Sequence, residues 1–147
     1  MKASCFFDVV GSALLLGSVT GNATAGSWHP ISPPAWVMAA QGTAGVTAYY
    51  DANSIVRMGK SAVRVWTKYE YSTPQQNPNV FGAKYVAVKE LDYFDCSAQT
   101  VEVESDTWYT ASGGDAGSND YSSNASHIVP NTVEAGVFNA VCEAAMK

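Results

Sequence analysis

The run from Ala62 to Tyr71 constrains the fold most, because β-branched and aromatic residues recur at every second position from Val63 to Tyr71. Val63, Val65, Thr67, Tyr69 and Tyr71 fall on one face, and Arg64, Trp66, Lys68 and Glu70 fall on the other. A period of two with β-branched and aromatic residues is typical of a half-buried strand. The sequence therefore predicts a sheet that buries one face.

Other segments have the same β-rich texture and are separated by Gly, Pro, Asn and Ser. Neighbouring strands joined by short turns predict an antiparallel meander of about six strands. We expect exposed loops at 72–80 and 111–127, where these turn-forming residues accumulate. The expected strands are Trp36–Ala40, Val46–Tyr50, a short Ile55–Arg57, Ala62–Tyr71, Lys84–Asp95 and Thr100–Thr110.

The spacing of the apolar residues changes near the C-terminus. Val133, Val137, Val141 and Ala145 recur every four residues, which indicates an amphipathic helix of about fifteen residues. Asn131 is the expected N-cap, with Glu134 as its capping-box partner. An apolar helical stripe has to be covered, so the predicted class is α+β, with the helix packed on the antiparallel sheet.

The N-terminus predicts export. Lys2, an apolar run from Val9 to Val19, and the small residues Ala23-Thr24-Ala25 have the order of a signal peptide. Residues 1–25 are therefore expected to be removed, which leaves one domain over 26–147.

Cleavage at this site would remove Cys5 and leave Cys96 and Cys142. Two cysteines in an exported domain indicate a disulfide, and their spacing does not match a zinc site. A bond between them would close a loop of 46 residues (142 − 96), which stabilises the fold by about 4 kcal/mol in the chain-entropy model. Because Cys142 lies on the apolar stripe, the bond would hold the helix against the sheet.

The charge of the chain argues against nucleic acid as a partner. The net charge is -5, with only 8 Lys and Arg, so we expect no nucleic-acid footprint. Beyond the predicted signal, no stretch is apolar enough to form an integral membrane segment.

No catalytic constellation is evident. Glu90 and Asp92 would share a strand face, as would Glu102, Glu104 and Asp106, and such alternation favours a solvated face over a glycosidase-type acid pair. The two histidines, His29 and His127, lie in segments expected to be irregular, which does not suit a hydrolytic triad. We therefore expect no catalytic residue, no metal site and no cofactor.

One surface stands out as a candidate contact site. Trp66 lies between Arg64 and Lys68 on the polar face of its strand, and an exposed Trp flanked by charges is a plausible interaction patch. The alternative is that the C-terminal helix covers this face. The sequence leaves the choice open.

The order of these features resembles the surface-adhesin protein E family of Gram-negative bacteria. The matching residues are Trp36, Tyr50-Asp51, Ser54-Ile55, Arg57, Gly59, Val63 to Trp66, Asp95-Cys96, Ile128-Val129-Pro130 and Val141-Cys142. The resemblance implies an antiparallel sheet with one C-terminal helix. It also implies a non-enzymatic module that binds host extracellular-matrix or plasma proteins, such as vitronectin and laminin.

A lipid-anchored surface protein needs a cysteine directly after the apolar run of its signal. Here Cys5 precedes the run and Gly26 follows the expected cleavage site. We therefore expect a periplasmic or extracellular protein that begins at Gly26 and carries no lipid. The alternative functions are a periplasmic envelope protein and a small domain of the enzyme-inhibitor kind, neither with a role in host binding.

Overall fold

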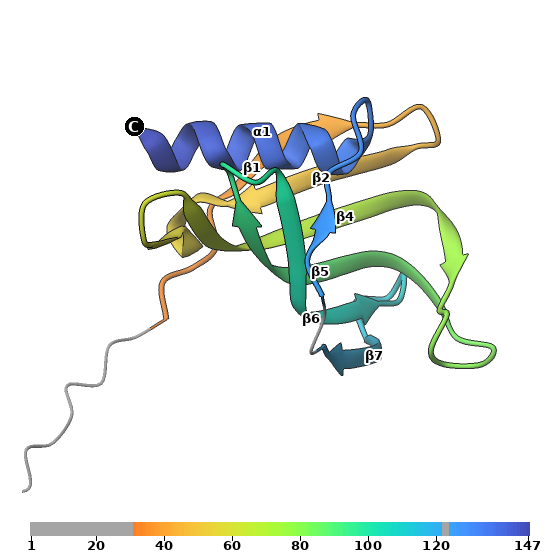
Figure 1. The fold of residues 1–147 in the computed structure, drawn as a ribbon. Coiled ribbons are helices and arrows are strands. Elements are labelled where there is room, and N and C mark those ends of the chain that lie inside the picture. The colour runs from red at the N-terminus through yellow and green to blue at the C-terminus, as the bar shows by residue number, and fades with distance from the viewer. Residues whose placement is uncertain (1–30, 122–123) are drawn as a thin grey trace, which may run out of the picture. The chain divides into compact units, whose positions relative to one another are not determined.

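A computed structural model describes residues 31–121 and 124–147, and the predicted signal peptide lies outside the described residues. The described part forms an antiparallel sheet of eight strands and one C-terminal α-helix (Figure 1). The predicted fold class is confirmed, although the sheet has more strands than the six expected. The elements are β1 (Trp36–Gln41), β2 (Val46–Asp51), the 3-10 turn η1 (Ala52–Ser54), β3 (Val56–Met58), β4 (Ala62–Gln76), β5 (Lys84–Asp95), β6 (Thr100–Tyr109), β7 (Asp115–Asp120), β8 (Ser126–His127) and α1 (Val133–Met146).

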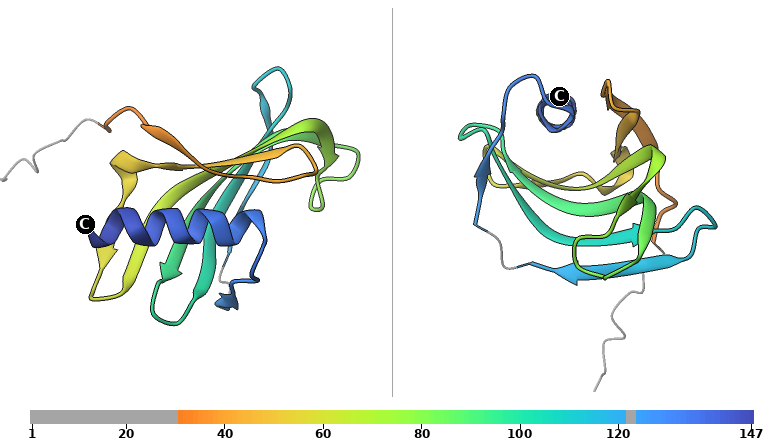
Figure 2. Two further views of the ribbon diagram at one scale, coloured as in Figure 1. Left: turned by 90° about the horizontal axis from the view of Figure 1, so that it is seen from above. Right: turned by 90° about the vertical axis from the view of Figure 1, so that its right-hand side faces the viewer.

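The sheet is a meander in the order β1-β2-β4-β5-β6-β7, with β3 added beside β4 and β8 beside β6. Strand β4 is the centre of the sheet, because it pairs with β2 and β3 on one side and with β5 on the other. The strands curve towards α1, which lies along one side of the sheet (Figure 2). We call the side that α1 covers the inner face and the opposite side the outer face.

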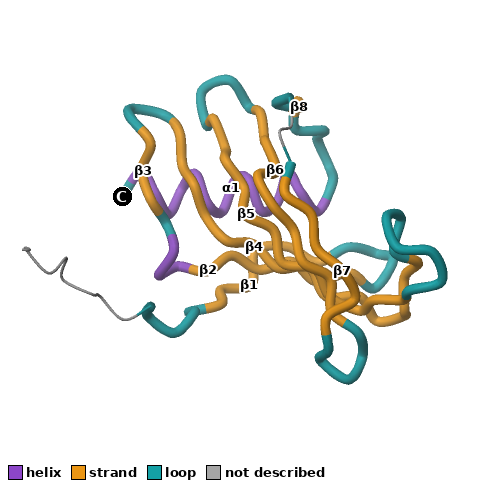
Figure 3. Tube along the Cα trace, turned by 90° about the horizontal axis from the view of Figure 1, so that it is seen from below, coloured by secondary structure: helices purple, strands orange, loops and turns teal. Residues whose placement is uncertain are grey.

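The main core lies between α1 and the inner face. Val63, Val65 and Phe94 from the strands pack with Val137 and Val141 from the helix, and each has at most 1% of its surface exposed. Gly136 allows this close approach, since a Cβ at that position would lie 2.5 Å from the Cβ of Ala40. Seen from the outer side, α1 crosses behind the strands (Figure 3).

The predicted disulfide is confirmed. Cys96 follows β5 and joins Cys142 on α1, with 5.8 Å between their Cα atoms. The bond therefore links the β5–β6 turn to the last turns of the helix.

Three local expectations are wrong. Strand β4 continues to Gln76, inside the expected loop 72–80, because Gln75 and Gln76 pair with Tyr85 and Lys84 beyond an irregularity in the ladder. The expected loop 111–127 contains β7 and β8, and both pair with β6.

The helix begins one residue later than expected. The N-cap is Thr132, whose Oγ1 accepts a hydrogen bond from the Ala135 backbone N–H at 3.1 Å. Asn131 instead has a left-handed backbone, with φ of 63°. Asparagine tolerates that conformation, so it serves the turn into the helix rather than the cap itself.

Candidate functional site

Strand β4 places Arg64, Trp66 and Lys68 on the outer face. Helix α1 packs against the opposite side of the same strand, over Val63 and Val65, so it does not cover Trp66. Trp66 keeps 37% of its surface exposed. The structure thus brings the three predicted patch residues to an uncovered face, and their binding role stays a prediction.

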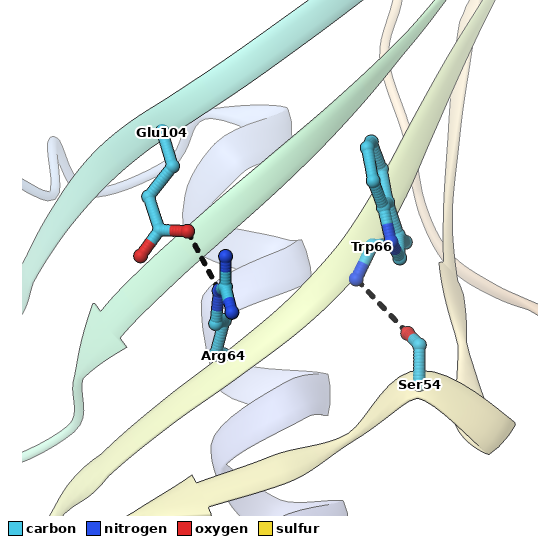
Figure 4. Close-up of polar contacts among 4 residues, drawn as sticks. All are labelled: Ser54, Arg64, Trp66 and Glu104. Atoms are coloured by element: carbon cyan, nitrogen blue, oxygen red, sulfur yellow. Dashed lines mark hydrogen bonds and ion pairs between the residues drawn. The ribbon is translucent and has the colours of Figure 1, made fainter. Parts of the chain in front are cut away.

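Two neighbouring contacts fix this part of β4 (Figure 4). The Arg64 Nε atom donates to Glu104 Oε2 at 2.6 Å, across β5. The Trp66 backbone N–H donates to Ser54 Oγ at 2.9 Å, which ties β4 to η1. Because Arg64 and Glu104 are 44% and 33% exposed, their ion pair adds little stability and leaves both groups accessible.

Beside Trp66, two lysines lie directly opposite each other on β4 and β5. Lys68 pairs with Lys89 in the ladder, and like charges in this position repel. The aromatic rings around them offset the repulsion, because a ring face attracts a cation. The Lys68 Nζ atom lies 5.0 Å from the Trp36 ring centroid and 4.5 Å from that of Tyr49.

The arrangement repeats on the other side of Trp36. The Lys89 Nζ atom lies 6.0 Å from the Trp36 ring centroid and 4.7 Å from that of Tyr109. We call the five residues Tyr49, Lys68, Trp36, Lys89 and Tyr109 the aromatic–lysine row. The row joins side chains of five strands across the outer face.

A cavity of about 270 Å³ opens next to the row. The segment before β1 forms part of its wall, so residues 31–34 lie against the outer face. The cavity is lined by Ile31, Ser32, Pro34, Trp36, Asp51, Trp66, Lys89, Thr107 and Tyr109. Three aromatic side chains, one ammonium group and one carboxylate therefore converge on one space.

Sequence reasoning found Trp66 and Lys68 but missed Trp36, Lys89 and Tyr109. The alternation of β5 does place Lys89 on the face opposite Val88. Its position beside Lys68 depends on the β4–β5 register, which the irregularity between Glu70 and Gln75 hides from the sequence.

The inner face contains the second chemical feature, and it corrects an expectation. Asp92 is only 1% exposed and Asp106 only 6%, so these acids do not form a solvated face. A bulge in β6 opposite Leu91 and Asp92 also separates Asp106 from Glu104. One extra residue reverses the alternation, so Asp106 pairs with Glu90 on the inner face while Glu104 contacts Arg64 on the outer face.

Burial raises the pKa values of these inner acids. The pKa of Asp92 is raised to about 7, mainly by loss of solvent, although the Thr67 hydroxyl donates to its Oδ2 at 2.7 Å. The pKa of Glu90 is raised to about 8 by burial first and then by the charges of Asp92, Asp106 and Glu134. Loss of solvent is thus the main cause of both raised carboxyl pKa values.

A second cavity, of about 300 Å³, lies among these acids and is lined in part by Glu90, Asp106 and Glu134. Within residues 31–121 and 124–147, no three His, Cys, Asp or Glu side chains are grouped so that they could hold a metal ion. His127 is exposed on β8, and His29 lies outside the described residues. Three of the inner acids, Glu90, Asp106 and Glu134, therefore share one cavity.

The model of the family described as Surface-adhesin protein E matches residues 36–143. The chain belongs to this family. The match spans β1 to α1 and includes both cysteines of the disulfide, so the adhesin-family resemblance seen in the sequence is confirmed. No curated protein and no solved structure matches the chain.

Membership of an adhesin family indicates a surface or secreted protein. In the described part of the chain, no helix combines the length and the apolar character that crossing a membrane requires.

Proposed function

We propose that this adhesin-family protein is an exported, non-enzymatic binding module whose outer face contacts a host extracellular-matrix or plasma protein. The observation that carries the proposal is the aromatic–lysine row beside Trp66. Tryptophan and tyrosine carry much of the binding energy of many protein interfaces, and here Trp36, Tyr49 and Tyr109 lie together, beside two lysines, on a sheet face that α1 leaves uncovered.

The surroundings of the row support the same reading. Strand β3 borders β4 and presents Val56 and Met58, which are 52% and 44% exposed. Together with Trp66 they place apolar surface next to charged groups. An apolar centre within a polar rim is the usual composition of a contact surface.

We also propose that the protein acts outside the cytoplasm, in the periplasm or beyond the outer membrane. The signal-like residues 1–25 and the family support this location. Mass spectrometry of the exported protein tests it. We expect a mature chain that begins at Gly26 without a lipid adduct, and a retained Met1 or a diacylglyceryl group would contradict the proposal.

The binding role can be tested with the mature protein and immobilised vitronectin and laminin in a surface plasmon resonance assay. We expect saturable binding that Trp66→Ala and Lys89→Glu each weaken at least tenfold. Lys84→Glu is the matched control, since it makes the same charge change at an exposed position of β5 outside the row.

Three outcomes would contradict the proposal. The first is the absence of binding to any matrix or plasma protein, which would favour the envelope role. The second is an equal loss in the Lys84→Glu control, which would reduce the effect to net charge. The third is unchanged binding by both row variants, which would place the contact elsewhere.

A further inference from the structure

The outer-face cavity has polar groups of opposite charge at its wall. Lys89 supplies an ammonium group, and Asp51 supplies a carboxylate. Among the described residues, no ion pair involves Lys89, whereas Lys68 is engaged with Glu70 at 2.8 Å. Lys89 is therefore the cation of the row that remains available to an anionic group.

Among the described residues, the hydrogen bonds to the Asp51 carboxylate end on one of its two oxygens. Its Oδ1 accepts hydrogen bonds from the backbone N–H groups of Ala35 at 2.7 Å and Asn53 at 3.0 Å. Those bonds fix the side chain and leave Oδ2 to accept from a hydroxyl donor. A ligand that fills the cavity should then carry both a negative charge and hydroxyl groups.

Aromatic side chains form much of the remaining wall. Trp36, Trp66 and Tyr109 line the space, and the hydroxyls of Ser32 and Thr107 lie at its wall. A pyranose ring presents apolar C–H faces that pack on aromatic rings, and its hydroxyls reach polar groups at the edge. The volume of about 270 Å³ is at the small end of ligand pockets and suits a single sugar unit.

We propose that this cavity binds an acidic sugar, a pyranose that carries a carboxylate, at the end of a glycan on the partner protein. The sugar carboxylate contacts Lys89, its ring packs against the tryptophans, and a hydroxyl donates to Asp51. The inference rests on the proposed function of the outer face and names the chemical group recognised there. An acidic peptide side chain fits less well, since it has neither a ring for the aromatic walls nor a hydroxyl for Asp51.

The direct test titrates the mature protein with N-acetylneuraminate and glucuronate, and with glucose and glutarate as a neutral ring and an open-chain carboxylate. The readout is the NMR shift of the indole N–H groups. We expect the acidic sugars to move the Trp36 and Trp66 signals at concentrations at least tenfold below those needed with either control. Trp108 is the internal reference, because it is 4% exposed and lies on the inner face.

Variants then test whether Lys89 is the cation that contacts the sugar carboxylate. Lys89→Met should weaken binding of the acidic sugars at least tenfold, Lys89→Arg should retain most of it, and Lys84→Met should leave it unchanged. Urea unfolding of each variant separates lost binding from lost folding. Equal binding of glutarate and the acidic sugars, or displacement by a polyglutamate peptide at similar concentration, would overturn the sugar assignment, and so would a folded Lys89→Met variant with full affinity.

The sugar inference and the proposed function can fail separately. If sialidase or glucuronidase treatment of the bound host protein leaves its affinity unchanged, the sugar inference is overturned while protein binding stands. If free acidic sugars bind as expected but no host protein does, the cavity assignment stands and the proposed host-binding function is overturned.

Discussion

Replacing Asp92 with asparagine should make the protein more stable at pH 8 and slightly less stable at pH 4.5. Asp92 is buried, its Oδ2 accepts a hydrogen bond from Thr67 Oγ1, and its Oδ1 has no partner in the described structure. An ionised carboxylate in this position is costly, because solvent is absent and Glu90, Glu104 and Glu134 add negative charge around it.

The sign follows from the direction of the pKa shift. The folded protein holds the Asp92 proton up to a pKa of about 7, whereas the unfolded chain releases it near 3.8. Between these values the folded state binds more protons, so the free energy of unfolding falls as the pH rises. Glu90 extends the same decline towards pH 8.

The magnitude can be worked from the same shift. Raising the pKa of Asp92 from 3.8 to about 7 destabilises the folded state by at most about 4 kcal/mol at a pH above both values. Asparagine removes this cost but buries an amide N–H without a partner, which costs about 1–3 kcal/mol. We therefore expect Asp92→Asn to raise the free energy of unfolding by about 1–3 kcal/mol at pH 8 and to lower it by about 1 kcal/mol at pH 4.5.

Urea unfolding followed by tryptophan fluorescence, with the disulfide intact, measures both free energies at pH 4.5, 6, 7 and 8. The Asp120→Asn variant is the control, since Asp120 is an exposed acid on β7. A free-energy difference between Asp92→Asn and the parent that stays constant across this pH range would refute the reasoning, as would an equal slope change in the control.

Further substitutions test the packing of α1. In the mature protein, Cys142→Ser should lower the free energy of unfolding by about 2–5 kcal/mol. Thiol titration of the denatured, unreduced mature protein should find no free thiol, and two titratable thiols would show that the cysteines are free. Gly136→Ala should lower the free energy of unfolding by about 1–3 kcal/mol, because the new Cβ would clash with Ala40, even though alanine favours a helix. Gly114→Ala is the control and should cost little. Equal urea midpoints for the two variants would count against the close approach of α1 to β1. Thr132→Ala should cost about 1 kcal/mol in the same assay and Thr132→Ser much less, and equal losses would show that the hydroxyl does not cap the helix.

The strands that the sequence predicts well are those whose side chains are apolar on one face. Lys84–Asp95 is placed with its exact bounds, and the alternation around Val63 and Val65 predicts a half-buried strand, although it leaves open which face the helix covers. Strand β7 could not be predicted in this way. Its residues Asp115 to Asp120 have low β propensity, and they form a strand because β6 offers a free edge.

The candidate site was predicted only in part for a related reason. Residues of one strand, such as Arg64, Trp66 and Lys68, can be grouped from their spacing. The cavity also needs Trp36, which β1 supplies, and Lys89, which only the register places beside Lys68. The burial of Asp106 escapes the sequence, because the one-residue bulge in β6 that turns this side chain to the inner face cannot be read from composition.

The position of the disulfide has a mechanical consequence. Cys142 lies in the last turns of α1, so a pull on the chain beyond the helix reaches the β5–β6 turn through a covalent bond before it can unwind the body of α1. The 46-residue segment that the bond closes cannot lengthen under load. Stretching the oxidised protein end to end should therefore yield roughly 150–165 Å less extension than stretching the reduced protein. In such an end-to-end pull, the bond would keep β6, β7 and most of the helix out of the path of the force.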